Sequence, residues 1–215
     1  MESHIQSVED SLIDGLSFHL PNSANFITNR RSVSYTPSGG NDFSPQGVRH
    51  IKFPIAGTDW VDPSTIRVQF RLSNRDPQHP LLLINPLPAN FFRRVRILAG
   101  GQVIEDIDYY NRVYNMVHTL LPSERRLNDF TEGFGHGRGI NNAGTTADFH
   151  SGTLFLPEAI PVGQSRTVMF QLMCGLFNQS KFLPLRYLQG LQIELEVVAN
   201  YTDVCIEQPA PGLGL

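Results

Sequence analysis

The clearest sequence signal for the fold lies in the stretch Ile66-Arg67-Val68-Gln69-Phe70-Arg71-Leu72-Ser73. Apolar and polar side chains alternate at every position of it. Because successive side chains of a β-strand point to opposite faces, this period of two predicts a strand with one dry face and one wet face. Arg67 and Arg71 belong to the predicted wet face.

Similar short runs occur on both sides of this stretch, separated by clusters of Gly, Pro, Asn and Asp. With 18 Gly and 15 Pro in 215 residues, the chain has the many short elements and turns of an all-β protein. The pair Gly100-Gly101 between two alternating runs predicts a hairpin. Besides 66–73, strands are predicted over 32–36, 48–55, 93–98, 102–106, 153–156, 166–174 and 191–199, with a further candidate over 203–207.

Two helices are predicted. Val8, Leu12 and Leu16 recur every four positions, which predicts a short amphipathic helix over 7–20, on an arm formed by residues 1–31. Asp108 is expected to cap a second helix over 109–121, whose apolar stripe is Tyr110, Val113, Tyr114, Val117 and Leu121. Residues 123–152 are polar and glycine-rich and are expected to form a long surface loop.

These elements predict an all-β fold, an eight-stranded antiparallel jelly-roll sandwich with one crossover helix and an N-terminal helical arm. The predicted domain covers residues 32–207, and residues 208–215 form a Pro/Gly tail or the start of a connector. An immunoglobulin sandwich is disfavoured, because Trp60 lies between predicted strands and no Cys…Trp…Cys spacing is present. Alternating βα units, which a doubly wound sheet requires, are not evident.

Charge and composition exclude several classes of function. The net charge is −3 and no Lys or Arg precedes Arg30, so the sequence lacks the electrostatic footprint of a nucleic-acid-coating protein. It therefore predicts no sequence-specific nucleic-acid binding. No apolar run approaches 18 residues, so no membrane span is predicted. Cys174 and Cys205 lack metal-ligand spacing and are expected to be small core residues.

The sequence contains no pattern typical of a catalytic, metal or cofactor site. The seven histidines have no metal-binding spacing and are expected to be ordinary loop or surface residues. Glu105, Asp106 and Asp108 could hold Ca²⁺, but a helix cap and a strand end explain them more simply. The glycine run 133–139 lacks the Lys-Ser/Thr of a phosphate-binding loop. We therefore predict no catalytic residue, no metal and no cofactor.

The unusual features are the low charged fraction of 17%, arginines on strand faces and an amphipathic arm. Together they suggest a surface that copies of the same chain cover. Arg67, Arg71, Arg94 and Arg96 are candidate interface residues, and plain solvated arginines are the alternative. Val8, Leu12 and Leu16 of the arm would bind a neighbour or an inner-shell protein. The second hypothesis is a jelly-roll carbohydrate-binding module with Trp60 as its anchor; an enzyme is less supported.

Three stretches carry a family resemblance: 62–70, 92–112 and 182–198, which contain the runs Asp62-Pro63-Ser64-Thr65, Leu98-Ala99-Gly100-Gly101-Gln102 and Phe182-Leu183-Pro184-Leu185-Arg186. Over about residues 30–206 the chain resembles the first jelly roll of double jelly-roll major capsid proteins, found in polinton-like viruses, virophages and related eukaryotic DNA viruses. The resemblance implies trimeric capsomers made of copies of the chain, in an icosahedral virion capsid around double-stranded DNA. Other capsid or minor capsid proteins are expected as further partners. Because 215 residues hold one roll, the chain is either half of a longer product or a single-roll relative.

Overall fold

The computed structural model describes residues 29–135, 138–140, 146–147, 155–156, 159–188 and 190–207. The chain divides into two compact units, residues 1–34 and 35–215, and every described helix and strand belongs to the second. The predicted arm helix, with Val8, Leu12 and Leu16, lies outside the described residues, and so does the tail 208–215.

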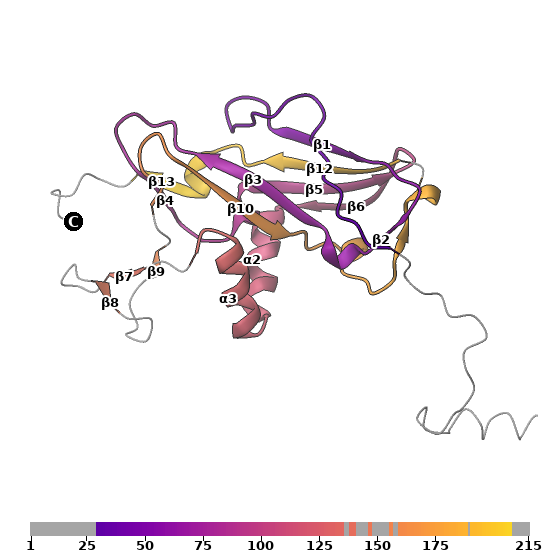
Figure 1. The fold of residues 1–215 in the computed structure, drawn as a ribbon. Coiled ribbons are helices and arrows are strands. Elements are labelled where there is room, and N and C mark those ends of the chain that lie inside the picture. The colour runs from indigo at the N-terminus through magenta and orange to yellow at the C-terminus, as the bar shows by residue number, and fades with distance from the viewer. Residues whose placement is uncertain are drawn as a thin grey trace, which may run out of the picture. The chain divides into compact units, whose positions relative to one another are not determined.

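The largest sheet has four antiparallel strands in the order β1-β12-β5-β6 (Figure 1). These strands are β1 (His50–Ile55), β12 (Leu191–Val197), β5 (Phe92–Ala99) and β6 (Gln102–Asp108). Gly100 and Gly101, with φ of 57° and 78°, join β5 to β6. Positive φ at both turn residues matches the right-handed twist of the flanking strands, so the predicted Gly-Gly hairpin is confirmed.

A second layer is formed by β3 (Arg67–Ser73) and β10 (Ser165–Gln171), which pair antiparallel along their whole length. They run side by side across one face of the four-stranded sheet (Figure 1). Pairing is nested: β3 and β10 lie between β1 and β12 in the chain, and β1 pairs with β12. A long antiparallel hairpin wrapped into two layers has this topology, so the antiparallel jelly-roll class is confirmed.

The remaining strands are short and pair across the loops. They are β2 (Trp60–Val61) with β11 (Leu183–Pro184), β4 (Leu81–Leu83) with β13 (Cys205–Glu207), and β7 (Arg138–Ile140) with β8 (Thr146–Ala147) and β9 (Phe155–Leu156). Short 3-10 helices cover Pro63–Thr65, Pro88–Phe91, Gly175–Phe177, Leu185–Tyr187 and Tyr201–Asp203. Trp60, which we expected in a loop, therefore stands in a two-residue strand.

The core between the two layers is aromatic. Phe92 of β5 stacks on Phe170 of β10 at a centroid distance of 5.5 Å, and Phe70 of β3 meets Phe92 edge-on at the same distance. Offset-stacked and edge-to-face rings add a favourable electrostatic term to the burial of their large apolar area. The predicted dry face of the strand over 66–73 is confirmed, because Val68 is buried and Phe70 and Leu72 pack against the core.

Two helices, α2 (Tyr110–Leu120) and α3 (Ser123–Glu132), follow the β5–β6 hairpin (Figure 1). The predicted apolar stripe of α2 is wrong in part, since Tyr110, Tyr114 and His118 are the buried side chains and Val113 and Val117 are exposed. A spacing of four residues fits both stripes. The larger rings take the core side, where the Tyr110 hydroxyl accepts a hydrogen bond from Met173 N at 2.8 Å.

Three other expectations need correction. Residues 32–36 form no strand; nearby, Ser38 makes a single bridge to Lys52. The start of the predicted loop 123–152 is α3, which is held by the i,i+4 ion pair Arg125–Asp129 and by Phe130, whose ring lies 5.3 Å from that of His118. Asp108 does not cap the helix, because the N-cap residue is Tyr109 in the left-handed conformation.

Candidate assembly surface

The outer face of the four-stranded sheet carries a row of charges. Its register places Lys52 of β1, Glu194 of β12, Arg96 of β5 and Asp106 of β6 side by side across all four strands. Each member of the row has neighbours of opposite sign, an arrangement that stabilises cross-strand pairing. Side chains alternate along β5, so Arg94 and Arg96 point outward because Val95 and Ile97 are buried in the core.

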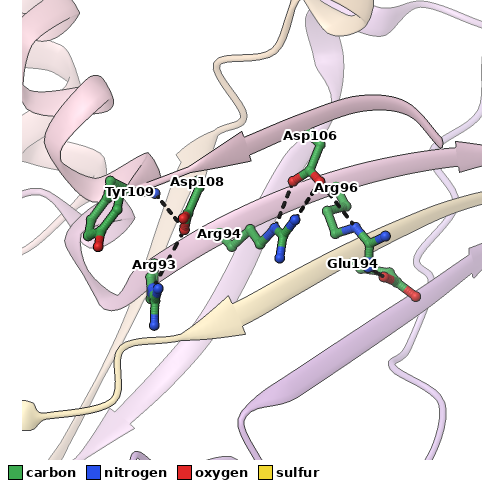
Figure 2. Close-up of polar contacts among 7 residues, drawn as sticks. All are labelled: Arg93, Arg94, Arg96, Asp106, Asp108, Tyr109 and Glu194. Carbon is green, nitrogen blue, oxygen red and sulfur yellow. Dashed lines mark hydrogen bonds and ion pairs between the residues drawn. The ribbon is translucent and has the colours of Figure 1, made fainter.

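The contacts within the row are short (Figure 2). Arg94 Nε and Nη2 donate to the two carboxylate oxygens of Asp106 at 2.7 and 2.6 Å. Arg96 Nη1 donates to Glu194 Oε2 at 3.3 Å, and its Nε lies 3.6 Å from Asp106 Oδ2. The hydrogen bonds from Arg94 lower the pKa of the Asp106 carboxyl, and the same pair raises the pKa of Arg94. The face is therefore internally charge-compensated.

The four candidate interface arginines divide between the two layers. Arg94 and Arg96 lie together on β5 and are paired within the chain, while Arg67 and Arg71 lie on β3. Arg67 Nη1 donates to Ser64 O at 2.8 Å, and its Nε lies 4.0 Å from Glu132 Oε2. Arg71 is exposed and has no ion-pair or hydrogen-bond partner among the described residues. Of the four, Arg71 keeps its donors available for a neighbouring molecule.

The three carboxylates of β6, Glu105, Asp106 and Asp108, also contact separate parts of the structure. Both oxygens of Glu105 accept backbone hydrogen bonds, from Gly175 N at 2.8 Å and Leu176 N at 3.2 Å. Asp106 binds Arg94, and Asp108 Oδ1 lies 3.5 Å from Arg93 Nε. The three carboxylates thus serve three different partners. Within the described part of the chain, no group of three or more His, Cys, Asp or Glu side chains is placed to hold a metal ion.

One histidine departs from our expectation of loop or surface residues. His118 is only 2% exposed, and its Nε2 lies 3.1 Å from Asp129 Oδ2, although the ring N–H is not aligned for a hydrogen bond. Burial lowers the pKa of His118, and the nearby Asp129 carboxylate opposes that shift. His118 is therefore part of the packing between α2 and α3.

The outer side of α2 is an apolar stripe that the sequence analysis did not identify as exposed. Its members are spaced i, i+3, i+4 and i+7, so they share one helix face, which we call the α2 outer face: Val113, Met116, Val117 and Leu120. Met116 is 71% exposed and Leu120 is 84% exposed. The sequence could have shown this exposed stripe, because the residues of α2 form two stripes on different sides of the helix and only one of them can face the core.

A pocket of about 400 Å³ lies at the start of α2. Asn90, Arg93, Tyr109, Arg112, Asn115 and Asp203 are among the residues that line it. Tyr109 has φ 52° and ψ 39° and is the only non-glycine residue of the described chain with positive φ. That conformation costs a bulky residue about 1–3 kcal/mol. The pocket escaped sequence reasoning because its residues come from separate segments of the chain.

Among the described residues, no helix has the length and apolar character needed to cross a bilayer.

The similarity of the chain to known proteins lies in its structure. No protein-family model matches the chain, and no curated protein sequence matches it. Among solved structures, the chain is similar to VP54 of the virus PBCV-1, in a crystal structure fitted into a cryo-EM reconstruction of the virophage Sputnik. The TM-score is 0.50 at 18% sequence identity, over 82% of this chain and 38% of VP54.

Two further similar structures are a quasi-atomic model of the PBCV-1 virus capsid and the cryo-EM structure of the Sputnik virophage. The first has a TM-score of 0.46 at 18% identity, over 82% of this chain and 38% of that chain. The second has a TM-score of 0.49 at 10% identity, over 92% of this chain and 46% of that chain. The chain thus spans less than half the length of the proteins it matches. Its fold is a jelly roll like that of double jelly-roll viral major capsid proteins.

Proposed function

We propose that this chain is a structural subunit of a viral capsid and that its function is to associate with copies of itself. Two observations support the proposal. The fold is like that of VP54, and most of the Met116 and Leu120 side chains on the α2 outer face is exposed. The exposure of apolar side chains on the α2 outer face is the observation that supports self-association most directly.

The physical reason lies in the two apolar sides of α2. Tyr110, Tyr114 and His118 bury one side against the domain, and the α2 outer face is left exposed. A helix with apolar residues on two sides is stable in water when both sides are covered. Fully burying a Met or Leu side chain contributes about 1.5–3 kcal/mol. In a shell built from many identical subunits, a second copy is the partner of highest local concentration.

The further features of this proposal follow from the family resemblance. The capsomer is a trimer, its partners include other capsid or minor capsid proteins, and its location is the virion. The role is structural and not enzymatic. The exposed Trp60 fits the alternative carbohydrate-binding module, but the likeness of the fold to VP54 favours the capsid role.

The test is a pair of substitutions on the α2 outer face, Met116→Ser with Leu120→Ser. Both side chains are exposed, so the fold is retained, and loss of their burial weakens self-association at least about tenfold. The matched control is Val48→Ser with Val162→Ser, two exposed apolar residues away from α2. Sedimentation velocity gives the association constant of each protein. Equal association of the two double variants and the wild type would overturn the proposal.

A further inference from the structure

The pocket at the start of α2 is lined by several hydrogen-bond donors, and some of them have no acceptor among the described residues. Asn90 is the deepest of its polar residues, at 4% exposure. Arg93 and Arg112 line the pocket beside it. A buried amide and two guanidinium groups around one cavity call for a ligand with acceptor oxygens.

The orientation of the Asn90 amide is fixed by a chain of hydrogen bonds. Leu87 N donates to Asn85 Oδ1 at 3.0 Å, so the Asn85 amide nitrogen must point the other way. That nitrogen donates to Asn115 Oδ1 at 3.0 Å, and Asn115 Nδ2 donates to Asn90 Oδ1 at 2.6 Å. A backbone N–H can only donate, so every amide in the series has one orientation. Asn90 Nδ2 is the donor at its end and has no partner in the described chain.

The two arginines are held beside the pocket by Tyr109. The guanidinium carbons of Arg93 and Arg112 each lie 5.3 Å from the centre of the Tyr109 ring. Arg93 is also 3.5 Å from Asp108, whereas Arg112 has no carboxylate partner among the described residues. The ring that orients both cations is the one with the left-handed backbone conformation, and such outliers cluster at ligand sites.

The charge around the pocket selects the ligand. Arg93 and Arg112 are balanced in part by Asp108, which pairs with Arg93, and by Asp203, which lines the pocket. A group with one negative charge and two acceptor oxygens suits these donors better than a doubly charged phosphate, which the two aspartates would repel. We propose that the pocket binds a carboxylate group.

Two sources have this chemistry: a free small carboxylate, or an acidic side chain from a second copy of the chain. The cavity of about 400 Å³ lies within the range of small-ligand sites, and the second source rests on the proposed self-association. The 215-residue chain is titrated with N-acetylglutamate amide, with its uncharged glutamine analogue and with inorganic phosphate. The titrations are done at constant ionic strength and at protein concentrations too low for self-association. Binding is followed by NMR chemical shifts.

The glutamate derivative binds and the glutamine analogue binds at least about tenfold more weakly, because the charge-assisted hydrogen bonds are lost. Arg112→Gln, an exposed position, weakens binding by at least about tenfold. Asn90→Asp, which keeps the acceptor for Asn115 and removes the free donor, weakens it as well. The control Arg186→Gln, an exposed arginine away from the pocket, binds like the wild type.

Circular dichroism confirms that each variant is folded; if Asn90→Asp does not fold, Arg112→Gln decides the question alone. Equal binding of the glutamine analogue, tighter binding of phosphate, or wild-type affinity in Arg112→Gln would overturn the proposal. The effect of the glutamate derivative on self-association then distinguishes the two sources of the carboxylate. If the glutamate derivative lowers it, the carboxylate comes from another copy. If self-association is unchanged, the ligand is a free carboxylate.

Discussion

Arg94 and Asp106 are joined by two parallel hydrogen bonds of 2.7 and 2.6 Å, although the sheet register sets Arg94 opposite Asp108. This diagonal pairing leaves Asp108 for Arg93 and for the backbone N–H of Tyr109, at 3.0 Å. The charged face of the sheet is thereby linked to the turn that starts α2. Asp108 thus contacts Arg93 and Tyr109, and both of these residues line the pocket.

The Arg94–Asp106 pair makes the stability of the domain depend on acid pH. The pKa of Asp106 is lowered in the folded state, so its contribution to the free energy of unfolding is present above the ordinary carboxyl value of 3.8 and is lost as the pH falls through the lowered pKa. Asp106→Asn removes this contribution. We expect a shallower loss of stability at acid pH in urea unfolding of Asp106→Asn. Asp203→Asn is the control and should lose stability with falling pH as the wild type does. If Asp106→Asn also loses stability as steeply as the wild type, the Arg94–Asp106 pair does not contribute as described.

Ile97 tests the aromatic and aliphatic core behind the charged face. Its side chain is completely buried on β5. Ile97→Ala removes three carbons and leaves a cavity, so the free energy of unfolding should fall by about 2–5 kcal/mol. Ile104→Ala on the neighbouring strand, where the side chain is exposed, should cost less than about 1 kcal/mol. If denaturant unfolding shows similar losses of the free energy of unfolding for both variants, Ile97 is not a core residue.

The long strands and the hairpin could be predicted because period-two alternation and Gly100-Gly101 are local signals. The buried side of α2 could not, since both apolar stripes fit a helical period and only the position of β10 decides between them. Helix α3 was missed because residues 123–132 are mostly polar and the helix gains stability from contacts with α2. The pocket depends on separate loops brought together by the fold.

His118 gives the domain a second pH dependence, near neutral pH. Burial lowers the folded-state pKa of His118, Arg125 and Arg126 lower it further, and Asp129 opposes them. The unfolded chain therefore binds a proton more readily, so stability is full above the ordinary pKa of 6.5 and falls as the pH drops below it. His118→Asn should flatten the stability curve between about pH 5 and 7. Wild-type stability that rises as the pH falls over this range would contradict the assignment.

Cys174 is expected to be chemically inert in the folded protein. It is buried, and burial raises the pKa of its thiol to about 12. Because the thiolate is the reactive form, an aromatic disulfide reagent should modify Cys174 only when the domain opens. The measurement uses a Cys205→Ser background, so that Cys174 is the single thiol. Fast stoichiometric labelling under native conditions, at the rate seen in denaturant, would show that the thiol is accessible.

Self-association of the 215-residue chain is the most direct test of the capsid role. Sedimentation velocity over a concentration series, combined with electron microscopy of the same samples, measures it without any substitution. We predict a discrete oligomer, with the trimer as the first species, that grows into larger assemblies as concentration rises. A single 24.1 kDa species at every concentration, with no particles in the micrographs, would contradict the account.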